Sequence, residues 1–308
     1  MLTVISWNVD GWHTIRDAQV ELIDASGAEL ALLQEVTSES AEVLRAAGWQ
    51  VVTALELLSR EHVEREGRRP RFSCAVATRG RLAIAGAEVL TDAPSPVRTL
   101  VARITRPAGD GAFTAMSAAL PPGSMWGREA KQGQARVIGT HLAALDGPVI
   151  VGMDRNGPEH ERFDPADTEW WPEDEPALFA DDAPHGLRDV LVTLHAEHPE
   201  RRGAARAERP DGPLEVSYIE QRTTPPSPRR YDVILASVDW HVKDVTYDHD
   251  AAVAAGSDHC PVSASSELRS CWQFLQRMSP APRVGGTLVR SYSASVASPN
   301  CSSARLVP

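Results

Sequence analysis

The order of apolar and amphipathic segments at the start of this chain limits its fold more than any other feature. Residues 2–7 form a short apolar run rich in β-branched side chains, which favours a strand. Residues 16–25 have helical spacing, residues 29–33 predict a buried strand, residues 38–47 a second helix, and residues 49–53 a third strand. Strands that alternate with helices in this way predict a layered α/β fold.

The middle of the chain follows a different pattern. Four strand-like segments, 72–78, 82–90, 97–105 and 113–118, are separated by short turn-rich pieces, so we expect antiparallel hairpins. The remaining predicted elements are a helix over 126–145, a strand over 148–152, a helix over 186–196 and strands over 230–237, 240–247 and 260–265.

Composition changes near Ser266, and this change sets the predicted domain boundary. We expect one domain over residues 1–265 and a disordered tail over residues 266–308, which is rich in Ser, Pro and Arg. Within the domain, residues 157–185 are rich in Asp, Glu, Pro and Trp, and residues 199–228 in Arg, Pro and Gly. Both segments predict long surface loops.

The charge of the chain argues against a protein that binds nucleic acid over a broad surface. The 308 residues carry a formal net charge of -11 at pH 7. Proteins that bind nucleic acid without sequence preference usually carry a basic surface, because neutralising phosphates supplies most of their affinity. A nucleic-acid substrate at a local site is still compatible with this charge, since a bound divalent cation offsets several carboxylates.

Targeting signals and metal-binding cysteine patterns are not evident in the sequence. The N-terminus lacks a basic segment followed by a long apolar stretch, and no run approaches the roughly 20 apolar residues of a membrane-spanning helix. The 4 cysteines show no CxxC spacing, so neither a zinc site nor a redox pair is indicated. We expect a cytoplasmic protein that makes no membrane contact and is a monomer.

Five short polar motifs stand at or just after the ends of predicted strands. They are Ser6-Trp7-Asn8-Val9-Asp10-Gly11, Leu33-Gln34-Glu35, Gly152-Met153-Asp154-Arg155-Asn156, Arg230-Tyr231-Asp232 and Ser257-Asp258-His259. In layered α/β folds the strand ends hold polar groups at one rim, where ligands bind. Each motif alone has an ordinary structural explanation, such as a turn, a helix cap or a salt-bridged histidine. The five together favour a single site.

The residue types in these motifs suit phosphoryl chemistry. Carboxylate and amide oxygens are the ligands that Mg²⁺ and Mn²⁺ prefer. A bound cation neutralises charge on a phosphate, and a carboxylate can orient the attacking water. The sequence therefore predicts a Mg²⁺- or Mn²⁺-dependent site that acts on a phosphoester.

The order of the motifs resembles that of the endonuclease/exonuclease/phosphatase family, which includes apurinic endonucleases, pancreatic-type deoxyribonucleases and inositol phosphatases. The first motif is especially similar to the opening of the apurinic endonucleases, and the resemblance covers residues 1–265. It implies a four-layer αββα sandwich with two central mixed, mostly antiparallel sheets. That expectation agrees with the mixed pattern of strands and helices.

The resemblance also implies which residues bind the metal. Glu35 matches the glutamate of the family that is the main metal ligand. Asp10 and Asp258 are expected to assist it, directly or through water. Asn8 is expected to hold the site or the phosphate.

Catalytic roles follow from the same resemblance. Asp154 is expected to align and deprotonate the attacking water, and Asn156 to contact the phosphate or position that water. His259 is expected to contact a phosphoryl oxygen, where a cationic imidazole stabilises developing negative charge. Asp232 is expected to hold His259.

One position departs from the family pattern. The family commonly has a histidine or tyrosine that contacts the phosphate at the end of the strand before the long helix, and Ala119 stands there in this chain. Alanine neither donates a hydrogen bond nor carries charge, and loss of one such donor typically costs about 10²–10³ in rate. Either a nearby group such as Ser117 or Ser124 replaces the missing side chain, or catalysis is impaired.

The sequence therefore favours a divalent-metal-dependent hydrolase of phosphodiester bonds, such as an endonuclease or an exonuclease that acts on DNA or RNA. Two alternatives stay open. One is a phosphatase or phosphodiesterase for a small phosphorylated molecule, which the acidic net charge favours. The other is a binding protein that keeps the scaffold with impaired catalysis, which Ala119 favours.

Overall fold

The beginning of the chain folds as an alternation of strands and helices. In the computed structural model it comprises β1 (Leu2–Asn8), α1 (Asp17–Ala25), β2 (Leu30–Thr37), α2 (Ser38–Ala46) and β3 (Gln50–Thr53). The structure describes residues 1–59, 71–107, 111–158, 160–163, 167–169, 176–180 and 182–268. The predicted tail therefore lies outside the described residues, except for its first three.

Strands dominate the remainder of the described chain. The further elements are α3 (Ala54–Leu57), β4 (Phe72–Thr78), β5 (Ala83–Glu88), the 3₁₀ helix η1 (Pro96–Arg98), β6 (Thr99–Thr105), β7 (Ala112–Ala119), α5 (Gly123–Trp126), α6 (Arg128–Ala143), β8 (Val149–Asp154), α7 (Pro176–Phe179), β9 (Arg188–Asp189), α8 (Val190–Glu197), α9 (Pro199–Glu208), β10 (Tyr218–Glu220), β11 (Ser227–Arg229), β12 (Asp232–Ala236), β13 (Trp240–Tyr247), α10 (His249–Ala254) and β14 (Val262–Leu268).

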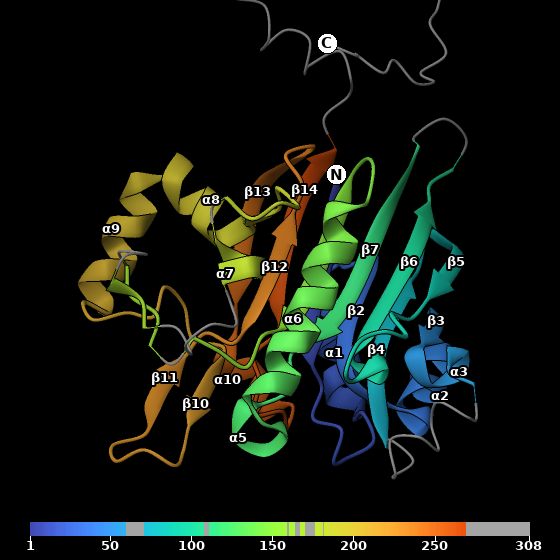
Figure 1. Ribbon diagram of the computed structural model, residues 1–308, viewed down its shortest axis with the longest axis horizontal. Helices are drawn as coiled ribbons and strands as arrows, with labels where there is room; N and C mark the ends of the chain where they lie inside the picture. Colours follow the sequence, from blue (N-terminus) through green and yellow to red (C-terminus); the bar gives the residue numbers. More distant parts are fainter. Residues whose placement is uncertain are drawn as a thin grey trace, which may run out of the picture. The chain divides into compact units, whose positions relative to one another are not determined.

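Two six-stranded sheets form the centre of the fold (Figure 1). The first sheet has the strand order β13-β14-β1-β2-β4-β3, and the second has the order β5-β6-β7-β8-β12-β9. Each sheet contains one parallel pair, β1 with β2 and β7 with β8, while the other neighbours are antiparallel. The predicted mixed, mostly antiparallel sheets are therefore confirmed.

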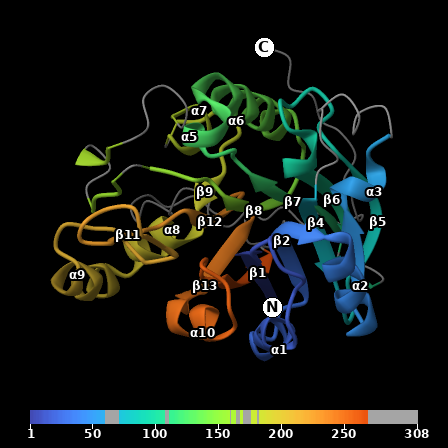
Figure 2. The same cartoon turned by 90° about the horizontal axis from the view of Figure 1, so that it is seen from below.

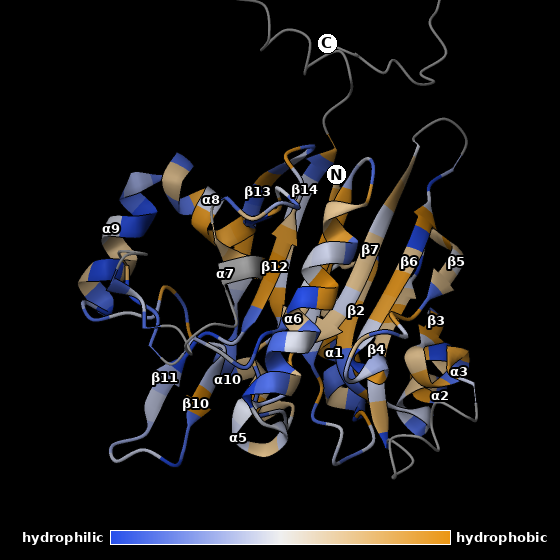
Figure 3. Cartoon of the chain, viewed as in Figure 1, coloured by the Kyte–Doolittle hydropathy of each residue, from blue (hydrophilic) through white to orange (hydrophobic). Residues whose placement is uncertain are grey.

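Helices cover the outer face of each sheet, so that the fold has four layers (Figure 2). One apolar core lies between the sheets and includes Val4, Leu32 and Ile234. A second core packs α1, α2 and α10 on the first sheet, and a third packs α6 and α7 on the second. Apolar residues accordingly predominate along several strands of both sheets (Figure 3). The predicted αββα sandwich is confirmed.

The two sheets approach each other closely within the strands that carry the predicted site motifs. A Cβ built on Gly152 would lie 2.6 Å from the Cβ of Leu32 and 2.6 Å from the Oγ of Ser6, so only glycine allows this spacing. Gln34 bridges the same gap, because its Nε2 lies 3.2 Å from the Oγ of Ser117 and 3.3 Å from the carbonyl oxygen of Gly152. These contacts fix the sheets relative to each other beneath the motifs.

Several predicted element boundaries were wrong. The segment 199–228, predicted as a loop, contains α9 and the β10–β11 hairpin. The predicted helix 186–196 begins later, since Arg188–Asp189 pairs with β12 as β9. β14 continues to Leu268, where it pairs with Trp240. None of the helices that the structure describes is long and apolar enough to cross a membrane.

Candidate active site

Three neighbouring strand ends of the second sheet bring predicted site residues together. Ala119 at the end of β7 pairs with Asp154 at the end of β8, and Asp154 pairs with Asp232 at the start of β12. Residues that pair directly across neighbouring strands project their side chains from the same face. Asp154 is 1% exposed and Asp232 is 0% exposed, so two carboxylates are buried side by side at this edge.

The first sheet supplies the opposite side of the site. Asn8 ends β1, and its Nδ2 donates to the Oδ2 of Asp154 over 3.1 Å, which links the two sheets. Glu35 lies in β2 where the pairing with β4 shifts between Leu33 and Val36. Such a β-bulge bends the strand and redirects a side chain, and bulges are common beside active sites.

The backbone is unusual at three predicted site residues. Asp10, Glu35 and Asn156 have φ angles of 59°, 59° and 47°, and they are the non-glycine residues with positive φ in the described part of the chain. This left-handed region is sparsely populated by residues with a side chain, and such residues cluster at functional sites. The residues with this unusual backbone conformation are therefore residues of the predicted site motifs.

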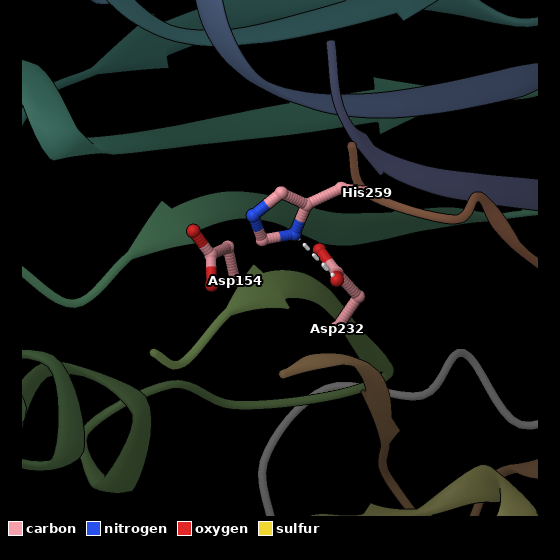
Figure 4. A group of neighbouring side chains, drawn as sticks. All are labelled: Asp154, Asp232 and His259. Carbon is pink, nitrogen blue, oxygen red and sulfur yellow. Dashed lines mark hydrogen bonds and ion pairs between the residues drawn. The ribbon is translucent and has the colours of Figure 1, made fainter. Parts of the chain in front are cut away.

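His259 and Asp232 form a buried pair (Figure 4). The Nδ1 of His259 lies 2.8 Å from the Oδ2 of Asp232, and the ring of Tyr218 packs on the imidazole with centroids 4.9 Å apart. Burial disfavours the charged imidazole, but Asp232 and Asp154 outweigh burial and raise the pKa of His259 to about 10. The two carboxylates thus favour the protonated imidazole, and the other ring nitrogen faces the side of Asp154 (Figure 4).

Asp154 is held by hydrogen bonds from two asparagines. Its Oδ2 accepts from the Nδ2 of Asn8 and, over 2.9 Å, from the Nδ2 of Asn156. Its Oδ1 accepts from the backbone N–H of Asn156 over 3.0 Å. Burial raises the pKa of Asp154, and the charge of Asp232 adds to this while His259 opposes it. A carboxylate with a raised pKa in a fixed orientation is suited to accept a proton.

Glu35 stands between a backbone donor and a cation. Its Oε2 accepts from the N–H of Gly11 over 3.2 Å, and its Oε1 lies 4.0 Å from the Nη2 of Arg98. Burial raises the pKa of Glu35, and Arg98 opposes this shift. Asp154 and His259 also act on that pKa, so Glu35 lies within electrostatic reach of both.

Asp10 and Asp258 lie at the margin of the site. The N–H of Asp10 donates to the Oδ1 of Asn8 over 3.1 Å, and its own Oδ1 accepts from the N–H of Trp12 over 3.3 Å. Asp258 is exposed, and its charge contributes to the raised pKa of His259. Both residues are near the site, but the hydrogen bonds that join its centre do not include Asp258.

One group in the described residues has the composition of a metal site. Ligand-type atoms of Asp154, Asp232 and His259 all lie within 4.8 Å of one another, and the group could hold a metal ion. It differs from the set predicted from the sequence, which was Glu35, Asp10 and Asp258. Two members of this group are carboxylates, and carboxylate oxygens are ligands that suit a hard divalent cation.

The surroundings of Ala119 show which polar groups are near that position. Ser117 donates to the carbonyl oxygen of Leu33 over 2.7 Å and is fully buried between the sheets. Ser124 is exposed on α5. Arg98 ends the 3₁₀ helix η1 and immediately precedes Thr99, which pairs with Ala118 of β7. The Nη2 of Arg98 lies 4.0 Å from the Oε1 of Glu35, so a guanidinium that the sequence analysis did not consider lies beside a predicted site residue.

Comparisons with known proteins identify the fold. No family model matches the sequence, and no curated protein matches it. Among solved structures, the endonuclease/exonuclease/phosphatase from Bacteroides vulgatus is 15% identical with a TM-score of 0.57 and covers 87% of this chain and 99% of its own. The chain has the endonuclease/exonuclease/phosphatase fold.

Two further solved structures have the same fold. The D. rerio TDP2 complexed with single strand DNA product is 17% identical, with a TM-score of 0.59 over 87% of this chain and 99% of its own. An AP endonuclease from Archaeoglobus fulgidus is 18% identical, with a TM-score of 0.58 over 87% of this chain and 100% of its own. The fold that the motifs predicted is confirmed by these similarities.

Two arginines and a glutamate form a buried cluster next to the candidate site, and the sequence analysis assigned them no role. Arg155 and Arg230 adjoin the site motifs on β8 and before β12, and both are 2% exposed. The Nη2 of Arg155 donates to the Oε1 of Glu161 over 2.8 Å, and the Nη2 of Arg230 donates to the same oxygen over 2.6 Å. Arg230 also pairs with Asp189 at 2.8 Å. The cluster ties the ends of the two strands together.

Lys131 is a second group that the sequence analysis missed. It lies on α6 with 1% of its surface exposed, and its Nζ donates to the carbonyl oxygen of Asn156 over 2.9 Å. The contact helps to hold Asn156 in its left-handed conformation. Its signal in the sequence is weak, because a lone lysine on a predicted helix is usually solvated.

Replacing Glu161 by glutamine should destabilise the fold in a pH-dependent way. Although burial disfavours its charged form, Arg230 and Arg155 lower the pKa of Glu161 to about 2, from an ordinary value of 4.5. A carboxyl group with a depressed folded-state pKa contributes stability above its unfolded pKa, and this contribution is lost as the pH falls towards 2. Glutamine should therefore cost about 3 kcal/mol at pH 7 and less at pH 3.

Urea unfolding at both pH values measures this difference. The matched control is Glu39→Gln, because Glu39 is exposed on α2. The control should change the free energy of unfolding little at either pH. An effect of Glu161→Gln that is equally large at pH 7 and pH 3 would show that the charge of Glu161 is not what stabilises the cluster.

Proposed function

We propose that the chain is a divalent-metal-dependent phosphoester hydrolase that acts on phosphodiester bonds. The observation that carries the proposal is the buried arrangement in which Asp154, fixed by Asn8 and Asn156, faces the His259–Asp232 pair. A proton acceptor next to a cationic donor suits attack of water on phosphorus.

Each side chain has a role that its contacts support. Asp154 takes the proton of the attacking water, and Asn156 helps to orient that water or the phosphate. His259, held at Nδ1 by Asp232, donates from its other ring nitrogen to a phosphoryl oxygen. Preorganised donors of this kind are worth several kcal/mol, because they do not need to reorient as charge develops.

Glu35 is the residue that we assign to the metal, with Asp10 and Asp258 as further ligands directly or through water. Oxygen donors of this type suit Mg²⁺ or Mn²⁺. The hydrogen bond between His259 and Asp232 favours this assignment over the Asp154, Asp232 and His259 group, because it already uses one ring nitrogen and one carboxylate oxygen. A bound cation supplies charge neutralisation at the phosphate.

Arg98 takes the place of the histidine or tyrosine that the family pattern has at position 119 and that this chain lacks. Its position just before Thr99, which pairs with Ala118, and its guanidinium 4.0 Å from Glu35 support a direct contact with the phosphate. Guanidinium groups bind phosphate oxygens through planar pairs of N–H donors. This assignment favours a working site over the alternative of a binding protein with impaired catalysis.

A panel of substrates tests the proposal. The full chain would be incubated with Mg²⁺ or Mn²⁺ and with plasmid, abasic DNA, RNA or a series of small phosphoesters, each with a chelator control. We expect metal-dependent cleavage of at least one polymer, an expectation supported by the DNA-bound TDP2 and the AP endonuclease that share the fold. Turnover of a small phosphomonoester alone would favour the phosphatase alternative, and turnover of none would remove the enzyme proposal.

A further inference from the structure

A cluster of aromatic side chains around one arginine borders the site on the side of Glu35. We call Trp12, Phe72, Arg98 and Trp126 the aromatic cluster. The rings of Trp12 and Phe72 meet edge to face with centroids 6.3 Å apart. The Arg98 guanidinium lies 5.9 Å from the centroid of Phe72 and 5.7 Å from that of Trp126. Residues from four separate parts of the chain therefore form one connected surface.

The tryptophans of this cluster are exposed, unlike the others that the structure describes. Trp12 is 63% exposed and Trp126 is 47% exposed. Trp7, Trp49 and Trp240 are 0%, 3% and 4% exposed. Large exposed apolar side chains that gather at one place usually mark a binding site. Both exposed indoles in the described residues lie at the same edge of the candidate active site.

The cluster is joined directly to the proposed reaction centre. Trp12 follows Gly11, whose N–H donates to Glu35, and Arg98 lies 4.0 Å from the Oε1 of Glu35. A Cβ built on Gly11 would lie 2.6 Å from the ring of Phe72, so the glycine lets the loop and the ring approach. A molecule whose phosphate reaches Arg98 would therefore place its neighbouring group against the exposed indoles.

We propose that the aromatic cluster binds an unpaired nucleobase next to the scissile phosphate, so that the preferred substrate is single-stranded nucleic acid. Bases stack on exposed aromatic rings, and this contact needs no particular sequence, since every base has a π-face. In a duplex the base faces are covered by their neighbours. The inference rests on the proposed function, because Arg98 is taken to contact the phosphate of the substrate.

The charge of the chain supports this choice of ligand. A net charge of -11 disfavours a broad basic surface that would bind both backbones of a duplex. Affinity for nucleic acid must then come from local contacts. The aromatic cluster offers a cation for a phosphate and aromatic rings for the base beside that phosphate. Arginine packed on an aromatic face keeps its edge N–H groups free to bind phosphate.

Binding measured without hydrolysis tests the proposal. The full chain in a chelator would be titrated with a fluorescent single-stranded oligonucleotide, the same sequence as a duplex, and a base-free strand with the same backbone. Trp12→Ala and Trp126→Ala should each weaken binding of the single strand by about 10-fold or more. Neither variant should change binding of the base-free strand, which should itself bind more weakly than the single strand.

A matched control is Val238→Ala. Val238 is 48% exposed and lies just after β12, which begins at Asp232 and ends at Ala236. The Val238→Ala change therefore removes exposed apolar surface at the end of the strand that is remote from the site. It should leave binding unchanged, and all three variants should keep the thermal midpoint of the wild type. Single-strand binding that is unaffected by both tryptophan changes, or tighter binding of the duplex, would overturn the proposal.

The same set of substrates separates this inference from the proposed function. With Mg²⁺ restored, cleavage of the base-free strand at the rate of the normal strand would refute the role of the cluster and leave the hydrolase intact. Tryptophan-dependent binding of the single strand without cleavage of any substrate would support the cluster and refute the hydrolase.

Discussion

Replacing Asp154 by asparagine is expected to lower the rate of phosphodiester hydrolysis by about 10³–10⁴-fold. Asparagine keeps the size of the side chain but removes the carboxylate that accepts a proton from water. It also presents an amide where the Oδ atoms of Asp154 now accept from Asn8 and Asn156. The measurement is kcat/KM on the substrate that the wild type cleaves best, with saturating Mg²⁺.

A second carboxylate provides the control for this variant. Asp244 lies on β13, pairs with Arg201 at 2.7 Å and has a side chain that is 49% exposed. Asp244→Asn should keep the wild-type rate, and both variants should keep the wild-type thermal midpoint. A folded Asp154→Asn protein with more than a tenth of the wild-type activity would contradict the role assigned to Asp154.

Loss of His259 should have the second largest effect. His259→Ala is expected to lower kcat by about 10²–10³-fold, because it removes a preorganised cationic donor to the phosphoryl oxygen. Asp232→Asn should have a smaller effect on rate, since the ring remains but loses the charge that holds it. The measurement is kcat for both variants over a range of pH.

The pH profile separates a positioning role of Asp232 from a purely structural one. Burial lowers the pKa of His259, and Asp232 and Asp154 together raise it to about 10, so the ring stays protonated below that value. Activity that needs the protonated ring is present at lower pH and is lost as the pH rises through the folded-state pKa. Asp232→Asn should move this alkaline limb to lower pH. If Asp232→Asn lowers the rate but leaves the pH of the alkaline decline unchanged, the role of Asp232 is only structural.

The convergence of the site could be predicted from the sequence because its residues stand at strand ends. Asn8, Asp154 and Asp232 each end or begin a strongly apolar strand, and such strands are recognisable without a structure. Their order along the chain carried the resemblance to the family. The register that sets Asp154 beside Asp232 follows only from the folded sheet.

The backbone at the site could not be predicted in the same way. A positive φ is expected mainly at glycine and less often at Asn and Asp, so Asp10 and Asn156 give only a weak signal and Glu35 gives none. The bulge that turns Glu35 depends on the pairing of β2 with β4, which joins strands far apart in the sequence. Long-range pairing therefore decides the local conformation.

The prediction failed most clearly at α9. Its sequence, PERRGAARAE, was grouped with a segment rich in Arg, Pro and Gly, yet most of its residues favour helix. Pro199 stands in the first turn of the helix, where proline is tolerated. The composition of the longer segment thus concealed the helix within it.

Arg98 shows why Ala119 was hard to interpret from the sequence alone. The sequence suggests replacement donors close to Ala119 in the chain, namely Ser117 and Ser124. Arg98 instead lies just before the neighbouring antiparallel strand β6, about 20 positions earlier in the sequence than Ala119. Cross-strand neighbours of this kind become visible only with the register.

The central claim is that Asp154 and its neighbours form a working metal-dependent hydrolase site. The most direct measurement is the initial rate at which the wild type and Asp154→Asn cleave a single-stranded oligonucleotide. Metal is first removed from both proteins with a chelator, and Mg²⁺ is then added in steps. The account predicts a rate that rises from zero with Mg²⁺ in the wild type and is at least about 10³-fold lower in Asp154→Asn at every concentration. A wild-type rate that does not depend on the metal, or equal rates in the two proteins, would contradict it.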